Sequence, residues 1–268
     1  MKATGREPTL YPHLGLFVRE CRENGVRSCV ITGGAGITRW KEMFKSACDH
    51  LRVSIDAAEP EAHAAIHCPM AGSDAFGERT AALEEIAAER LPRGLATGAT
   101  FLARGENRGE AGEFVRRWAG RLDYVRLAAI NYMAGGESSA EAAAAAGLAP
   151  NARLHSPLPE TEDAPVKPPF ACPALLARTV VTAEGNVCAC HRYRELEAAG
   201  IPAVYGNLYE KPFPGIWRSE RRRETIARVN EANMKSFREA GAYEAGPCAG
   251  CKYADVNRIN RWMIAHMQ

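Results

Sequence analysis

The chain has 268 residues, of which 46% are apolar and 25% charged, and its formal net charge is +2. This composition excludes fibrous and disordered chains, and the small net charge gives no support for a nucleic-acid or lipid-surface ligand. The sequence has neither an apolar run of the ~20 residues that cross a bilayer nor the apolar core of a signal peptide. We therefore expect a cytoplasmic protein that binds neither nucleic acid nor a membrane.

Residues 1–146 alternate between helical and strand periodicity. Apolar residues at 14, 17, 18 and 21 follow helical spacing, and Gly25 is a typical residue to end that helix. Strands are predicted at 28–32, 51–56, 94–104 and 123–130, and helices from Thr38 to about Cys48, over 74–90 and over 109–120. Because parallel neighbours need crossover helices, this alternation predicts a parallel sheet, either doubly wound or barrel-like.

The second part of the chain begins after a proline-rich segment. An alanine-rich helix is expected to end at Ala146, and residues 147–169 contain six prolines without periodicity, which predicts a connection. Beyond it, the β-branched run 179–182, a turn at 184–186 and a return strand from Val187 predict a hairpin. Helices are expected over 215–240 and 252–267.

The nine cysteines are unevenly distributed. Cytoplasmic thiols stay reduced, so metal or redox chemistry is favoured over disulfides. Four cysteines in the first quarter lack ligand-like spacing, and the other five lie in the last hundred residues: Cys172, Cys188, Cys190, Cys248 and Cys251.

The spacing of the later cysteines is typical of a metal centre. Cys248-Ala-Gly-Cys251 lets two thiolates converge on one centre, and Cys172 and Cys190 flank the predicted hairpin. Four thiolates hold either zinc or an iron–sulfur cluster, and the pattern leaves both open. The alternative is that these cysteines are small buried residues of the core.

The order of these motifs resembles the SPASM/twitch domain of radical SAM enzymes. The matching series is Cys172, Gly185-x-Val187-x-x-Cys190, Gly206-Asn207-Leu208, Ile216-Trp217-x-Ser219 and Cys248-x-x-Cys251. The resemblance implies an auxiliary [4Fe-4S] cluster held by Cys172, Cys190, Cys248 and Cys251. Cys188 is the extra cysteine, either a packing residue or a competing ligand.

The first half resembles the matching catalytic barrel. Thr4-Gly5-Arg6-Glu7-Pro8-Thr9-Leu10 is similar to the family's GGEPTL motif, with Arg6 in place of a glycine, Thr32-Gly33-Gly34 to its TNG turn and Val53-Ser54-Ile55-Asp56 to its VSIDG strand end. In the family these segments contact S-adenosylmethionine (AdoMet), so the resemblance implies that Gly5, Glu7, Ser54 and Asp56 bind this cofactor. They also fall at strand ends, where barrel enzymes place their function.

The sequence lacks the family's CxxxCxxC motif, which holds the catalytic cluster. In the family, this motif precedes the GGEPTL motif that the segment containing Gly5 resembles. We therefore expect a partial (β/α)6 barrel without its first strand over 1–146, the connection over 147–169 and a small α+β SPASM/twitch domain over 170–268. AdoMet, and an electron-donor protein, are expected only for a full-length form, and no catalytic residue is assigned.

The resemblance implies an enzyme that uses AdoMet and iron–sulfur clusters to abstract hydrogen from a peptide or small-molecule substrate. Without the catalytic cluster motif, this chain alone is expected to be inactive. The alternative hypothesis is a non-catalytic iron–sulfur or zinc-binding partner protein.

Overall fold

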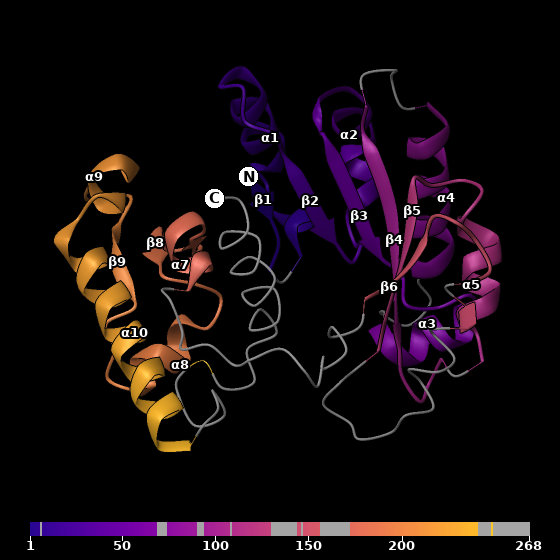
Figure 1. Ribbon diagram of the computed structural model, residues 1–268. Helices are drawn as coiled ribbons and strands as arrows, with labels where there is room; N and C mark the ends of the chain where they lie inside the picture. Colours follow the sequence, from indigo (N-terminus) through magenta and orange to yellow (C-terminus); the bar gives the residue numbers. More distant parts are fainter. Residues whose placement is uncertain are drawn as a thin grey trace. The chain divides into compact units, whose positions relative to one another are not determined.

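The computed structural model describes residues 1–5, 7–68, 74–89, 94–107, 109–129, 144–145, 147–155, 172–240 and 248. The backbone divides into two compact units, residues 1–156 and 157–268, which we call the N-terminal and C-terminal units. Figure 1 shows the helices and strands of each unit.

The N-terminal unit is built on a sheet of six parallel strands whose spatial order follows the chain (Figure 1). The strands are β1 (Lys2–Ala3), β2 (Cys29–Thr32), β3 (His50–Ser54), β4 (Ala96–Ala103), β5 (Tyr124–Ala129) and β6 (Ala152–His155). A sheet that grows in one direction without reversing its strand order is the arrangement of a barrel rather than of a doubly wound fold. The expected mixed α/β fold with a partial barrel is therefore confirmed.

Helical segments fill the connections between these strands. They are η1 (Pro8–Leu10), α1 (Leu14–Glu23), η2 (Ile37–Trp40), α2 (Lys41–Ala47), α3 (Pro60–His67), α4 (Ala75–Glu89) and α5 (Ala111–Trp118). Proline at the first position of α3 suits a helix start, because its fixed φ is helical and it has no N–H to satisfy. Glu7 caps η1 by accepting a hydrogen bond from the backbone N–H of Thr9.

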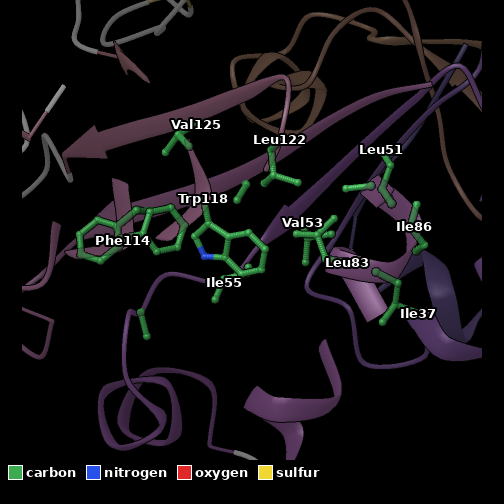
Figure 2. Close-up of a cluster of buried hydrophobic side chains, with 14 of the residues drawn as sticks. Ile37, Leu51, Val53, Ile55, Leu83, Ile86, Phe114, Trp118, Leu122 and Val125 are labelled. Carbon is green, nitrogen blue, oxygen red and sulfur yellow. The ribbon is translucent and has the colours of Figure 1, made fainter. Parts of the chain in front are cut away.

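The core of the N-terminal unit lies between the helices and one face of the sheet. Alternate strand residues such as Val53 and Val125 pack against helix residues such as Leu83, Phe114 and Trp118, all at most 1% exposed. Figure 2 shows the Trp118 indole between Phe114 and the strand side chains. Buried and less buried residues alternate along β2 and β3, so the remaining side chains of these strands lie on the opposite face of the sheet.

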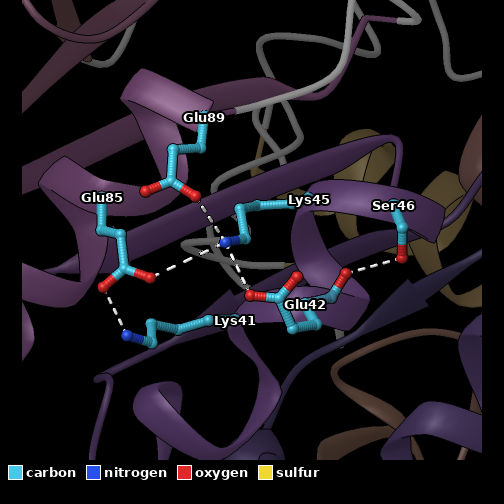
Figure 3. A network of polar contacts seen from close by, with 6 residues as sticks. All are labelled: Lys41, Glu42, Lys45, Ser46, Glu85 and Glu89. Carbon is cyan, nitrogen blue, oxygen red and sulfur yellow. Dashed lines mark hydrogen bonds and ion pairs between the residues drawn. The ribbon is translucent and has the colours of Figure 1, made fainter.

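Helices α2 and α4 are joined by an ion-pair network on the surface. Lys45 lies 2.6 Å from Glu42, 2.9 Å from Glu89 and 3.7 Å from Glu85, and Lys41 pairs with Glu85 (Figure 3). Hydrogen bonds from Lys45 to Glu42 and Glu89 raise the pKa of the lysine. Several pairs that share one lysine make a network, which stabilises more than isolated surface pairs do.

Three local expectations differ from the structure. Thr38 lies inside η2 and does not cap the following helix, which begins at Lys41. Helix α3 was not predicted, because its alanines and histidines give little amphipathic contrast. Strand β6 lies within residues 147–169, where a connection was expected; its four residues follow a proline-containing turn and carry no strand signal of their own.

The C-terminal unit contains a three-stranded antiparallel sheet in the order β7, β8, β9. Its elements are α7 (Pro173–Ala177), β7 (Val180–Val181), β8 (Asn186–Cys188), α8 (Tyr193–Ala198), β9 (Val204–Asn207), α9 (Phe213–Trp217) and α10 (Glu220–Ala240). The predicted hairpin is confirmed as β7 and β8. The helix expected over 215–240 is broken into α9 and α10, and the one expected over 252–267 lies outside the described residues.

The glycine and asparagine of the Gly206-Asn207 motif hold this small sheet together. Asn207 Nδ2 donates to Glu184 O and to Asn186 Oδ1, both at 2.9 Å, which ties the hairpin turn to β9. A Cβ at Gly206 would lie 3.2 Å from Ile216 Cγ1, so only glycine lets α9 pack this closely on the strand. These motif residues therefore have a structural role.

No helix within the described ranges is both long and apolar enough to cross a membrane.

Candidate functional site

The three segments that resemble AdoMet-binding motifs lie at one edge of the sheet. Gly5–Pro8 follows β1, Thr32–Gly34 ends β2, and Ser54–Asp56 ends β3. Since β1, β2 and β3 pair in parallel as immediate neighbours, their carboxyl ends meet at the same edge. The expectation that these segments line one end of a parallel sheet is confirmed. Parallel α/β proteins bind ligands at this end.

The Glu7 carboxylate ties the first two segments together. Its Oε1 accepts hydrogen bonds from the Thr9 backbone N at 3.0 Å, from Thr9 Oγ1 at 2.5 Å and from the Thr32 hydroxyl. Its Oε2 accepts from the backbone N of Gly33 at 2.8 Å. Thr9 Oγ1 in turn accepts from the Gly36 N–H at 3.1 Å. The side chain thus holds the loop after β1 against the turn after β2.

These bonds set the acidity of Glu7. Burial alone would raise its pKa, but the hydrogen bonds from Thr32, Thr9 and Gly33 outweigh burial and lower the pKa below its ordinary value of 4.5. A carboxylate whose pKa is lowered by folding stabilises the fold above its unfolded pKa. That stabilisation is lost as the pH falls through the folded value.

We expect Glu7→Gln to lower the stability of the N-terminal unit by about 1–2 kcal/mol at pH 7, because charged hydrogen bonds are replaced by neutral ones. Below pH 4.5 the difference from the wild type should shrink. Urea unfolding at several pH values, monitored by hydrogen exchange within this unit, measures both effects. The exposed Glu23→Gln variant is the control. A Glu7→Gln deficit that stays constant down to pH 3 would contradict the assignment.

Asp56 holds the end of β3 from inside. It is 6% exposed and adopts a positive φ of 60°, a conformation that aspartate tolerates better than most residues. Its Oδ1 accepts from the Leu102 N–H at 2.9 Å, and its carbonyl accepts from Asn107 Nδ2 at 2.7 Å. Ser54, two residues earlier, is half-buried on the opposite side of the strand from the core.

A buried histidine, His63, and a half-buried arginine, Arg79, form a pair that supports this edge and that the sequence did not predict. Arg79 of α4 lies with its Nη1 2.7 Å from His63 Nε2 of α3, and its Cγ would be 3.1 Å from a Cβ at Gly34. Burial, His67 and Arg79 lower the pKa of His63 to about 4, so the imidazole is neutral and accepts the arginine N–H. The two residues come from separate helices and form no sequence motif.

The opposite face of the sheet carries a second polar chain. Cys29 Sγ is hydrogen-bonded to His50 Nδ1 at 2.9 Å, and His50 Nε2 to Tyr124 Oη at 2.7 Å. Burial raises the pKa of Cys29 and lowers that of His50, so both are neutral near pH 7. Gly98 lies between β3 and β5 without a side chain, which leaves room for the Tyr124 ring.

In the C-terminal unit, three of the four predicted ligands border the same hydrophobic core. Cys172 precedes α7, Cys190 follows β8, and Cys248 lies beyond α10; all three are partly buried against this core. The fourth, Cys251, lies outside the described residues. Among the residues that are described, no three His, Cys, Asp or Glu side chains are gathered closely enough to hold a metal ion. The four-cysteine site therefore stays a prediction.

Cys188 is set apart from Cys190 by the local backbone. In a regular strand, residues two apart share a face, but Cys188 is the last residue of β8 and Cys190 lies beyond the end of the strand. Cys188 is fully buried, and its Sγ donates to Asn186 O at 3.7 Å. Burial, together with Glu197 and Glu184, raises the pKa of its thiol to about 11. These features favour a packing role for Cys188.

Two buried polar groups beside the predicted ligands fit an iron–sulfur centre. Tyr205 of β9 is 4% exposed, and its Oη has no hydrogen-bond partner. Burial raises the pKa of Tyr205 to about 12, and Cys190 and Cys172 are close enough to contribute to the increase. Asn233 Nδ2 donates to Cys248 Sγ at 3.4 Å. Thiols as ligands and buried donors around them are the chemistry that such a cluster requires.

Comparison with known proteins identifies both units by sequence. Residues 2–117 match the profile of the radical SAM superfamily, and residues 172–252 match that of the SPASM iron–sulfur cluster-binding domain. No curated protein gives a significant match.

Solved structures show the same fold. The crystal structure of Streptococcus suis SuiB aligns with a TM-score of 0.58 and 12% identity over 82% of this chain and 55% of SuiB. SuiB bound to S-adenosylmethionine aligns with a TM-score of 0.56 and 13% identity over 82% of this chain and 54% of that one. SuiB bound to the precursor peptide SuiA aligns with a TM-score of 0.55 and 12% identity over 82% of this chain and 54% of that one. This chain thus spans about half the length of these structures.

The parallel sheet with its motif-bearing edge matches the superfamily over the first unit, and the cysteine-bordered small sheet matches the cluster-binding domain over the second. Residues 2–117 therefore form a radical SAM superfamily domain, and residues 172–252 form a SPASM iron–sulfur cluster-binding domain.

Proposed function

We propose that this protein takes part in AdoMet-dependent radical modification of a peptide or small-molecule substrate, with one auxiliary [4Fe-4S] cluster in its C-terminal unit. Two observations in one chain support the proposal. The three segments that resemble AdoMet-binding motifs lie at adjacent strand ends of one sheet. In the SPASM-type unit, Cys172, Cys190 and Cys248 border one core.

At the edge of the sheet, backbone rather than carboxylates is proposed to face AdoMet. Glu7 already accepts a hydrogen bond from the turn after β2, and Asp56 accepts one from strand β4. Their role is therefore to position the segments that contain them. Gly5 has a φ of +138°, and a Cβ there would have no atom within 4 Å, which leaves the backbone accessible to a ligand. Ser54 is proposed to contact the cofactor directly.

In the C-terminal unit, Cys172, Cys190, Cys248 and Cys251 are proposed to hold the auxiliary cluster. When bound, such a cluster supplies one-electron chemistry or a binding point for substrate. The thiols of this chain must first lose their protons, so assembly is expected to be faster at alkaline than at acidic pH. The location proposed is the cytoplasm, where cysteines that hold a cluster stay reduced.

The substrate class follows from similarity alone. SuiB, which shares the fold, has been crystallised with a precursor peptide. A peptide is therefore one proposed substrate, a small molecule the other, and an electron-donor protein the proposed partner of the full protein.

Anaerobic reconstitution with ferrous iron, sulfide and an equal concentration of zinc tests the proposal. We expect about four iron and four sulfide per chain with a broad absorption band near the visible region that bleaches on reduction. A chain that takes up one zinc and no sulfide would overturn the proposal and support the non-catalytic metal-binding alternative.

A further inference from the structure

A bulge in β9 places one tyrosine apart from the regular strand pairing. Val187 pairs with Gly206 and Cys188 pairs with Val204, so Tyr205 is the extra residue between them. Bulges re-aim a side chain and are common next to active sites. Tyr205 is directed into the core of the C-terminal unit, which Cys172, Cys190 and Cys248 border.

The Tyr205 hydroxyl is unsatisfied in the described structure. Its Oη is buried without a hydrogen-bond partner, although burying a hydroxyl unpaired costs about 1–3 kcal/mol. A phenylalanine would pack equally well and avoid this cost. The cost is explained if the acceptor arrives with a ligand. Arg222, Cys190, Cys172 and Cys188 all influence the Tyr205 hydroxyl electrostatically, and two of these, Cys190 and Cys172, are predicted ligands.

A second donor contacts another of the predicted ligands, Cys248. Asn233 of α10 is 5% exposed, and its Nδ2 donates to Cys248 Sγ at 3.4 Å. Neither Tyr205 nor Asn233 belongs to the motifs by which the C-terminal unit was recognised. Both are uncharged donors, so they contribute hydrogen bonds without adding charge.

We propose that Tyr205 and Asn233 are positioning residues that donate hydrogen bonds to the sulfur atoms of the auxiliary cluster. This inference rests on the proposed function, because it requires the cluster. A reduced cluster carries one more negative charge than an oxidised one. Donors to sulfur therefore stabilise the reduced form more and raise the reduction potential.

The test is a redox titration of the reconstituted chain and four variants, in which reduction is monitored by the loss of visible absorption. Tyr205→Phe and Asn233→Leu should each retain the iron content of the wild type and have a lower midpoint potential. The double variant should show the sum of the two shifts, because the donors lie on different elements. Tyr209→Phe, at a tyrosine that is 83% exposed, is the matched control and should leave the potential unchanged.

The outcomes separate this inference from the proposed function. If the wild type binds no cluster, both fail. If Tyr205→Phe and Asn233→Leu hold a full cluster at the wild-type potential, this inference is overturned and the proposed function stands. If Tyr205→Phe does not assemble a cluster, two results decide: the potential of Asn233→Leu and the resonance Raman spectrum of the wild type. The Fe–S stretching bands must shift in D2O if exchangeable donors contact sulfur. Bands that do not shift overturn the inference.

Discussion

Trp118→Ala is expected to lower the free energy of unfolding of the N-terminal unit by about 3–5 kcal/mol, the usual cost of removing a large aromatic side chain from a closed core. Trp118 ends α5, is fully buried and packs with Phe114 and the sheet side chains of Figure 2. The cavity would open where the helix meets the strands, so the surroundings cannot collapse into it easily. Urea unfolding, monitored by hydrogen exchange within each unit, measures the change in the free energy of unfolding.

Trp118→Phe provides the internal comparison. The indole Nε1 of Trp118 is buried without a hydrogen-bond partner, so phenylalanine removes an unsatisfied donor while keeping most of the apolar volume. We expect it to cost less than half as much as alanine. Equal losses for the two variants would contradict the view that packed volume, rather than the indole itself, provides the stability.

Gly98→Val is expected to destabilise the N-terminal unit by about 3 kcal/mol, at the upper end of the cost of overpacking. A Cβ at Gly98 would overlap the Tyr124 ring, which crosses this position to reach His50. The valine must displace the ring and break the hydrogen bond between Tyr124 and His50. The loss of stability should therefore be accompanied by faster alkylation of Cys29, which is hydrogen-bonded to the other nitrogen of His50.

The comparison for this prediction is Gly120→Ala, at a glycine whose added Cβ would have no atom within 4 Å. That variant should unfold at the wild-type denaturant concentration, within 0.5 kcal/mol by the usual size of surface substitutions. Rapid Cys29 alkylation in the wild type, or a Gly98→Val chain as stable as Gly120→Ala, would show that the crossing ring is not required.

The strands of the sheet were predictable where their own residues carried the pattern. β2, β3, β4 and β5 have β-branched or apolar residues bounded by turns, and each was located within a few residues. β1 and β6 could not be found in this way. β1 has two residues and β6 has four, and each forms only because a parallel neighbour supplies its hydrogen bonds.

The candidate site was predictable to the same degree. The segments containing Gly5 and Ser54 were found because their motifs are contiguous, and topology then placed them at one edge. Arg79 and His63 could not be found, because their pairing depends on how α3 and α4 pack. Tyr205 was missed because a bulge, which has no residue signature here, moves it out of the strand pattern.

The central claim is that four particular thiols of the C-terminal unit hold one cluster. Native mass spectrometry of the anaerobically reconstituted chain tests it most directly, because it weighs the bound cluster on each variant. We predict the added mass of one [4Fe-4S] cluster on the wild type and on Cys188→Ala, and its loss from Cys172→Ala, Cys190→Ala, Cys248→Ala and Cys251→Ala. A cluster retained by Cys190→Ala and lost from Cys188→Ala would contradict the claim.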